Sequence, residues 1–459
     1  MSIATSITAK EIPYLRGWPL VGSQLALKYE RLHFLQRLSR LGDIAGFSFG
    51  TAPHFLVNSP QLIQEVLVEH AATFYHRGRY LRRAFIGNGL IISDGEFHRK
   101  QRKLMATLFQ PRHLATYAET ITRYGEQFQQ EMRHGEVIDL HQKMIDLAMS
   151  IFSKVLFDLE IRPGDEMMEA MDIALAHSAK VLFSLVAIPI HWPTPYNKRL
   201  QQARQVLQKR IRGAFQQRKE NSEHLSEQND LLSLLLQASD DEGSRMSDQQ
   251  VLDECRTLFI AGFETIAMAL IWTWYLLAQH PEVYQKVQKE VDSVLGGRTP
   301  TYEDLANLPY CLQVFKETLR LYPPAPMIRR EARDDVEVGG YHLARGSTVL
   351  ISAYTLHRRA DYFPEPERFD PERFTPEREK QLPRYAYLPF GGGPRVCLGN
   401  HFALMEGHLL LATLAQRLRF ELVANHPEVG FDLEHNLALR PDRKIEVIVH
   451  KRTEEEKQG

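Results

Sequence analysis

The longest uninterrupted helical pattern in the chain limits the fold more than any other feature. It begins at Ser247, which with Gln250 has the S-x-x-Q spacing of a capping box, and it continues to Gln279, where His280 and Pro281 stop it. A helix of this length extends for ~48 Å, enough to cross a whole domain. Apolar residues recur along one face, so we expect the centre of the helix to be buried.

Shorter patterns surround this helix. Helical periodicity dominates from residue 96 to about residue 320, and strand-like alternation bounded by turn residues lies on either side of it. The order of the elements predicts a mainly α fold with small β-sheets, of the α+β class. Expected helices are 30–40, 61–69, 281–295 and 309–321; expected strands are 44–49 and 54–58, and 336–338, 341–343 and 348–352 as one small sheet.

Composition describes an ordinary globular protein, with 44% hydrophobic and 25% charged residues in 459. No segment has the composition of a linker, so we expect a single domain over residues 1–459, with a disordered tail at 452–459. The formal net charge of −1 gives no reason to expect nucleic acid as a partner.

Three cysteines cannot form a disulfide framework, and such low usage fits a reducing cytoplasm. The N-terminus has no apolar core of a signal peptide. The most apolar run, 181–190, falls short of the ~20 residues that a membrane helix needs. We therefore expect a cytoplasmic protein without a transmembrane segment.

A glycine-rich loop near the end of the chain holds one of the cysteines. Residues 390–399 read F-G-G-G-P-R-V-C-L-G, and an apolar helical pattern follows at 398–418. The glycines let backbone pass close to a flat ligand and leave amide groups free to face the sulfur. The helix N-terminus and Arg395 favour a thiolate at Cys397. These features suit either a metal ligand or a redox nucleophile, whereas Cys255 and Cys311 are interpreted as small buried residues.

The loop resembles the heme-binding signature of the cytochrome P-450 monooxygenase family. That signature, F-x-x-G-x-R-x-C-x-G, is matched by Phe390, Gly393, Arg395, Cys397 and Gly399. The resemblance covers nearly the whole chain. It implies heme b (iron protoporphyrin IX) with Cys397 as the proximal iron ligand and Phe390 packed beside it. It also implies the family's fold, a triangular prism with a long central distal helix and a proximal cysteine loop.

Two further motifs occur in the family's order, E-T-L-R and P-E-R-F. By resemblance, Glu317, Arg320 and Arg373 form a buried charge triad that locks the cysteine loop to the core. Alone, a Glu–Arg pair at this spacing is a common surface pair, worth only ~0.2–0.5 kcal/mol.

The long helix contains A-G-F-E-T, from Ala261 to Thr265. The Thr265 hydroxyl is expected to bond back to the Ala261 carbonyl, as threonines in buried helices do. Opened slightly, the same bond makes a groove for dioxygen, and Gly262 lacks a side chain that would block close approach. The resemblance implies that Thr265 steadies dioxygen and that Glu264 belongs to the proton-delivery path. Considered alone, Glu264 is a solvated helix charge.

Heme carries two propionates, which need cations. The resemblance assigns this role to His98 and Arg102, one helical turn apart in H-x-x-x-R, and to Arg395. In M-I-R-R-E-A, Arg330 matches the family's propionate arginine better than Arg329 does.

An apolar substrate pocket is expected, with residues that resemble pocket-lining positions of the family: Leu90, Ile91, Ala261, Ala325 and Met327. The motif spellings look closest to bacterial long-chain fatty-acid hydroxylases, but a terpenoid, steroid or polyketide suits an apolar pocket nearly as well. Four arginines either attract the carboxylate of a substrate or belong to a solvated basic loop: Arg77, Arg79, Arg82 and Arg83.

The expected function is therefore hydroxylation or epoxidation of a hydrophobic small molecule with O2 and two electrons. No reductase domain is fused, so we expect a separate ferredoxin or flavodoxin with an NAD(P)H reductase, and a monomer. The alternatives are a peroxide-driven peroxygenase of the same fold, which would not need Glu264 and Thr265, and a non-catalytic heme-binding sensor. A heme-free cysteine-nucleophile enzyme would leave the ordered motifs unexplained.

Overall fold

The computed structural model describes residues 10–75, 87–162, 164–183, 192–240, 243–432 and 438–453. Contacts group the chain into two compact units, each assembled from segments distant in sequence. Unit 1 contains Met1–Gly78, Ala325–Glu367 and Leu382–Cys397. Unit 2 contains Arg79–Pro324, Arg368–Gln381 and Leu398–Gly459.

Unit 1 is built on a six-stranded sheet with the order β1-β2-β3-β9-β6-β4. Its strands are β1 (Tyr14–Leu15), β2 (Ile44–Phe49), β3 (Ala52–Val57), β4 (Phe74–Tyr75), β6 (Met327–Ala332) and β9 (Thr348–Ser352). Strand β3 pairs with β2 antiparallel and with β9 parallel, so two segments distant in sequence form the middle of the sheet. Its inward side chains, such as Val57 and Ile351, are fully buried.

A separate hairpin, β7 (Val336–Val338) with β8 (Tyr341–Leu343), also belongs to unit 1. The three strands predicted after residue 335 are confirmed, but their grouping is wrong, because β9 pairs with β3 and β6 instead of with the hairpin.

The remaining elements of unit 1 are short: α1 (Gln24–Tyr29), α2 (Arg31–Ser39), α3 (Pro60–Gln64), η1 (Glu65–Glu69), α14 (Ala353–Leu356) and η6 (Gly393–Arg395). The helix predicted at 61–69 is divided. Ser59 caps α3 by accepting the Leu62 N–H, and the chain then widens into the π-helical turn η1.

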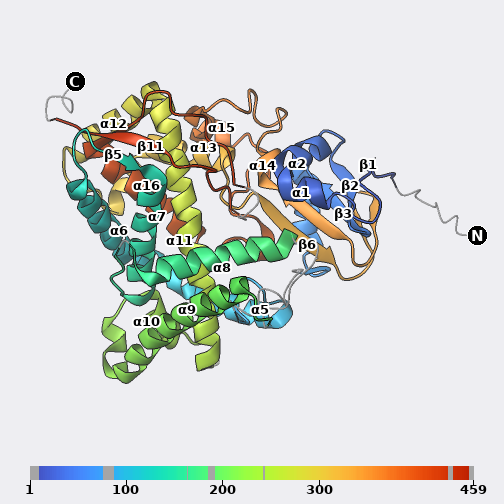
Figure 1. The fold of residues 1–459 in the computed structure, drawn as a ribbon, viewed down its shortest axis with the longest axis horizontal. Coiled ribbons are helices and arrows are strands. Elements are labelled where there is room, and N and C mark those ends of the chain that lie inside the picture. The colour runs from blue at the N-terminus through green and yellow to red at the C-terminus, as the bar shows by residue number, and fades with distance from the viewer. Residues whose placement is uncertain are drawn as a thin grey trace, which may run out of the picture. The chain divides into compact units, whose positions relative to one another are not determined.

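Unit 2 is mainly helical (Figure 1). Its helices are α5 (Gly95–Ala106), η2 (Thr107–Phe109), α6 (Pro111–Glu131), α7 (Leu140–Phe157), α8 (Glu166–Phe183), α9 (Pro195–Glu220), η3 (Ser222–Glu227), α10 (Leu231–Gln237), α11 (Asp248–Gln279), α12 (Pro281–Leu295), η4 (Glu303–Asn307), α13 (Pro309–Leu321), η5 (Pro371–Phe374), α15 (Pro376–Glu379) and α16 (Asn400–Arg417). One small antiparallel sheet joins β10 (Leu418–Leu422), β11 (Glu446–Lys451) and β5 (Val137–Asp139).

Helix α11 has the predicted bounds. The Ser247 side chain accepts the Gln250 N–H at 3.3 Å, and the helix ends at Gln279, before Pro281 begins α12. Trp272 shows how completely its second half is enclosed: the indole is fully buried and its N–H donates to the Leu439 carbonyl at 2.7 Å.

Among the described residues, α11 is the one helix long and apolar enough to cross a membrane by length and composition. However, 72% of its most apolar window is buried inside the protein, which is the environment of a core helix. The expected mainly α fold with small sheets is confirmed.

Candidate active site

The cysteine loop in unit 1 is closed by its own backbone. The Cys397 N–H donates to the Phe390 carbonyl at 2.9 Å, and the Val396 N–H donates to the Gly393 carbonyl at 3.1 Å. Cys397 is exposed, whereas Cys255 and Cys311 are fully buried, and burial raises the pKa of both buried thiols. Cys397 is therefore the cysteine whose sulfur a large ligand can reach.

Gly393 fixes where this loop lies. Its φ of +66° is in the left-handed region, and a Cβ at this position would come within 2.0 Å of the Leu67 carbonyl oxygen in η1. No side chain fits there. The glycine in the motif thus holds the loop against the π-helical turn, a role that the sequence alone did not indicate.

Helix α16 begins at Asn400, with Gly399 as its N-cap residue. The predicted start at residue 398 is two residues too early. Cys397 consequently lies outside the first turn of the helix, where the effect of the helix dipole falls off. The dipole contributes less to a thiolate than we expected.

Unit 1 also holds Phe390, Arg395 and Arg330. Phe390 and Arg395 are half-buried, and Arg395 lies in η6. Arg330 is only 7% exposed on β6, whereas its neighbour Arg329 reaches His54, with 3.1 Å between Nη2 and Nε2. This engagement of Arg329 supports the choice of Arg330 as the candidate cation.

The Ala261–Thr265 segment lies in α11 of unit 2. The Thr265 hydroxyl donates to the Ala261 carbonyl at 3.0 Å, with the Gly262 carbonyl at 3.3 Å, as expected for a threonine in a buried helix. The structure also shows a packing reason for a glycine at position 262. A Cβ there would come within 2.1 Å of the Phe152 ring on α7, so the missing side chain makes room for the packing of α7 against α11.

Glu264 is 9% exposed, so it is not the solvated charge that its residue type alone suggests. Burial raises the pKa of Glu264 to about 7. Arg440 lowers this pKa, and Asp172 raises it by a smaller amount. Arg440 donates to Asp172 at 3.1 Å and to His141 at 3.2 Å, and the Asp172 side chain is 56% exposed. These partners could not be predicted from the sequence, because they lie on separate segments.

His98 and Arg102 lie one turn apart on α5, as predicted. His98 is 5% exposed and Arg102 is half-buried. The structure places these two cations in unit 2 together with Thr265, and Arg330 and Arg395 in unit 1 together with Cys397.

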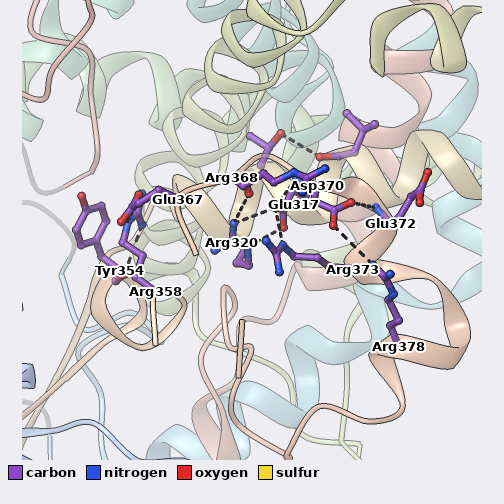
Figure 2. A network of polar contacts seen from close by, with 12 residues as sticks. Glu317, Arg320, Tyr354, Arg358, Glu367, Arg368, Asp370, Glu372, Arg373 and Arg378 are labelled. Atoms are coloured by element: carbon purple, nitrogen blue, oxygen red, sulfur yellow. Dashed lines mark hydrogen bonds and ion pairs between the residues drawn. The ribbon is translucent and has the colours of Figure 1, made fainter. Parts of the chain in front are cut away.

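The predicted charge triad is present in unit 2 (Figure 2). Arg320 donates to both carboxylate oxygens of Glu317, at 2.7 and 2.9 Å, and both side chains are fully buried. Arg373 lies 3.4 Å from the same carboxylate, which also accepts the Asp370 N–H at 2.9 Å. Burial and a bidentate geometry distinguish this pair from an ordinary helix-surface pair.

Besides Ala261 on α11, the other four residues expected to line the substrate pocket have different environments. Leu90 is buried and its N–H donates to Glu254 of α11 at 2.8 Å, while Ile91 is half-buried in the same loop. In unit 1, Met327 is half-buried and Ala325 is exposed. The arginines at 77, 79, 82 and 83 lie outside the described residues.

Comparison with known proteins identifies the family. The family model described as Cytochrome P450 matches residues 12–449. The chain is 37% identical to cyclooctatin synthase of Streptomyces melanosporofaciens over 88% of each chain. It is 36% identical to cyclooctat-9-en-7-ol 5-monooxygenase of the same organism, over 92% of this chain and 93% of the relative. Pentalenene oxygenase of Streptomyces avermitilis is 30% identical, over 87% and 89%.

Among solved structures, a retinoic acid-bound cyanobacterial CYP120A1 is similar with a TM-score of 0.84 and 25% identity, over 97% of this chain and all of that one. Heme in this family is bound through a cysteine thiolate, and the loop described above fits that group, since it presents one exposed thiol on a backbone that is closed on itself. The chain belongs to the cytochrome P450 family and is a heme-thiolate oxidoreductase that incorporates oxygen.

Proposed function

We propose that the protein hydroxylates a terpenoid, using dioxygen and two electrons from a separate redox protein. The relatives named for cyclooctatin, cyclooctat-9-en-7-ol and pentalenene support this substrate class over the fatty acid and steroid that the sequence left open. Ferredoxin or flavodoxin with an NAD(P)H reductase remains the expected electron source.

Cys397 is the residue that would hold the heme iron, because its thiol is exposed in the closed loop while the other two cysteines are fully buried. His98, Arg102, Arg330 and Arg395 are the proposed partners of the propionates. When bound, heme supplies the activation of dioxygen and the oxidation of an unactivated C–H bond.

One observation carries the proposed mechanism: an alcohol and a buried acid are adjacent in the middle of α11. The Thr265 hydroxyl, held on the Ala261 carbonyl, can turn outward and donate a hydrogen bond at its Oγ1. The carboxyl of Glu264, with a pKa of about 7, can hold a proton at neutral pH and release it.

The partners of Glu264 extend this arrangement toward solvent. The charge of Arg440 lowers the pKa of the Glu264 carboxyl, and Arg440 donates to the exposed carboxylate of Asp172. Reorientation of Glu264 between Thr265 and this pair would return a proton from solvent to the helix. A peroxide-driven enzyme or a heme-binding sensor has no use for such an acid–alcohol pair, so both alternatives are less favoured.

Two measurements test the proposal. The reduced, carbon monoxide-bound protein should show the red-shifted Soret band of thiolate ligation, and Cys397→Ser should abolish that shift. A Soret band without this red shift in the unmodified protein would refute the assignment of Cys397.

For the substrate class, the reconstituted enzyme should oxidise polycyclic terpenes faster than fatty acids or steroids of similar size. Turnover of fatty acids alone would overturn the terpenoid assignment while leaving the heme assignment intact.

A further inference from the structure

The loop of residues 87–93, which precedes α5, is attached to α11 through its backbone. The Asn88 N–H donates to the Asp253 carboxylate at 2.7 Å, and the Leu90 N–H donates to the Glu254 carboxylate at 2.8 Å. The loop and the helix both belong to unit 2. Two carboxylates at adjacent positions of α11 therefore hold two amides of a loop that is distant in sequence.

Glu254 holds the loop from a fully buried position. One of its oxygens accepts the Leu90 N–H, and the other accepts the side-chain amide of Gln250 at 2.6 Å. The same amide donates to the Asn88 carbonyl at 3.3 Å. Burial raises the pKa of Glu254 to about 7, and the hydrogen bonds from Leu90 and Gln250 lower it. A buried carboxylate is costly unless hydrogen bonds compensate it, and both oxygens of this one are engaged with the loop, directly or through Gln250.

Gly89 brings the loop into direct contact with the helix. A Cβ at this position would come within 1.9 Å of the Thr257 Oγ1 and within 2.9 Å of the Asp253 carbonyl oxygen. A side chain there would push the loop away from α11. The glycine and the hydrogen bonds on either side of it therefore fix the distance between the loop and the helix.

The loop lies on the side of α11 that carries Thr265. At 100° per residue, Ala261 and Thr265 both point within ~20° of the direction of Glu254, because they follow it by seven and eleven residues. Thr257, which Gly89 contacts, points within ~60° of the same direction. Along the axis, Thr257 precedes Ala261 by ~6 Å and Thr265 by ~12 Å. The loop thus covers the Thr265 face of the helix about two turns before Thr265.

Three apolar side chains follow Gly89 in this loop: Leu90, Ile91 and Ile92. Leu90 and Ile92 are 8% and 4% exposed, and Ile91 is half-buried. Loops are generally more mobile than the elements they connect, so an apolar tip keeps one position only if other groups hold it. The hydrogen bonds to α11 and the close contact at Gly89 provide that support.

We propose that Glu254 is a positioning residue that holds the Leu90–Ile91 tip as a wall for the substrate beside Thr265, and so selects the carbon that is oxidised. The inference rests on the proposed function and deepens it by assigning a determinant of regioselectivity. A terpenoid offers few polar groups that could fix its orientation, so apolar walls must do so. A shift of such a wall by ~1 Å is enough to change which carbon reaches reactive geometry.

The attachment of the loop is tested without turnover. Hydrogen–deuterium exchange of the heme-loaded protein should be slow at the amides of Asn88 and Leu90. Glu254→Ala removes the acceptor and should speed exchange at Leu90 roughly tenfold or more. Glu254→Gln keeps an acceptor oxygen of the same reach and should retain most of the protection. Equal exchange in the unmodified protein and the alanine variant would overturn the proposal.

The effect on the reaction is measured with the reconstituted enzyme, to which a polycyclic terpene and a fatty acid are each offered. In Glu254→Ala the ratio of the main hydroxylated regioisomer to the others should fall roughly fivefold to tenfold. Glu254→Gln should restore the ratio of the unmodified enzyme. Gly89→Ala displaces the same loop by a different contact and should also broaden the products.

Asp248→Asn is the matched control on the same helix. Asp248 lies in the first turn of α11, is exposed and pairs with Lys219 at 2.6 Å, so its replacement should change neither the amide exchange at Leu90 nor the regioisomer ratio. Thermal melts of all variants separate a loss of fold stability from a change of selectivity.

A Glu254→Ala enzyme that melts lower but retains the regioisomer ratio would show that Glu254 supports only the fold, and would refute the proposal while terpene turnover stands. Broader oxidation of the fatty acid without any terpene turnover would refute the proposed substrate class and leave the positioning role of Glu254 intact.

Discussion

The carboxylate of Glu317 receives two hydrogen bonds from Arg320 in a part of unit 2 that solvent does not reach. Arg373 and the Asp370 N–H complete its surroundings (Figure 2). Because Glu317 and Arg320 are fully buried, removal of the carboxylate leaves the guanidinium groups of Arg320 and Arg373 without their common acceptor.

Glu317→Ala should lower the free energy of unfolding by about 3–5 kcal/mol and give protein that does not retain heme. Urea unfolding and the ratio of heme to protein measure the two effects. Glu372→Ala, which breaks an exposed pair with Lys286, is the control and should cost no more than about 1 kcal/mol. A Glu317→Ala protein with full heme content would contradict the assigned role.

Thr265→Ala should separate electron consumption from product formation. Loss of Oγ1 removes the hydroxyl that can donate from α11, so product formation should fall roughly 10²-fold while NAD(P)H is still consumed and peroxide is released. Thr265→Ser keeps the hydroxyl and should restore coupling. Unchanged coupling in the alanine variant would argue against proton transfer through this residue.

The pKa of Glu264 predicts a pH dependence of turnover. The carboxyl holds its proton below pH 7 and loses it above, since burial raises its pKa to about 7. If it donates that proton, the rate should fall as the pH rises through 7, and Glu264→Gln should lose this dependence together with most activity. A Gln variant with the same pH profile would assign the titration to another group.

Gly393→Ala should disrupt the cysteine loop. The added Cβ meets the Leu67 carbonyl, and the φ of +66° is strained for any other residue, so we expect a loss of stability of more than about 3 kcal/mol and a lower heme content. Gly346 has a φ of +82° with open space around it, so Gly346→Ala isolates the strain and should cost about 1 kcal/mol. Equal effects in the two variants would show that the contact with Leu67 is unimportant.

Glu406 on α16 predicts that stability decreases toward alkaline pH. The residue is 1% exposed, its Oε1 has no partner among the described residues, and burial raises its pKa to about 8. The folded protein therefore favours the protonated form. The contribution of Glu406 to the free energy of unfolding is complete below about pH 4.5, which is the pKa of this carboxyl in the unfolded chain. It is lost as the pH rises through 8.

Glu406→Gln should therefore melt at a higher temperature than the unmodified protein at pH 9 and at a similar temperature at pH 4.5. Thermal melts across this range provide the comparison. A Gln variant that is less stable at pH 9 would show that the ionised carboxylate has a partner.

Capping, proline and glycine residues predicted where several helices begin and end. The capping serine at 247, the prolines at 281 and 309, and the glycine at 296 define the bounds of α11, α12 and α13 as the structure has them. The charge triad was predicted through the resemblance of E-T-L-R and P-E-R-F to the motifs of the family, since the spacing alone indicates only a surface pair.

Features set by distant contacts were not predictable. Strand β6 was missed, because M-I-R-R-E-A shows no alternation and becomes a strand by pairing with β9. The widening of the chain at η1 and the reason for Gly262 both depend on a neighbouring segment. The loop that α11 holds is distant in sequence, and no spacing rule connects Leu90 with Glu254.

The pairing of β3 with β9 has a consequence for biosynthesis. His54 lies beside Thr348 in this parallel pair, so β3 leaves the ribosome long before its partner exists. At ordinary rates of translation the wait is on the order of tens of seconds, during which the apolar edge of β3 is unpaired in the nascent chain. A larger supply of chaperones that cover this edge should therefore raise the soluble yield.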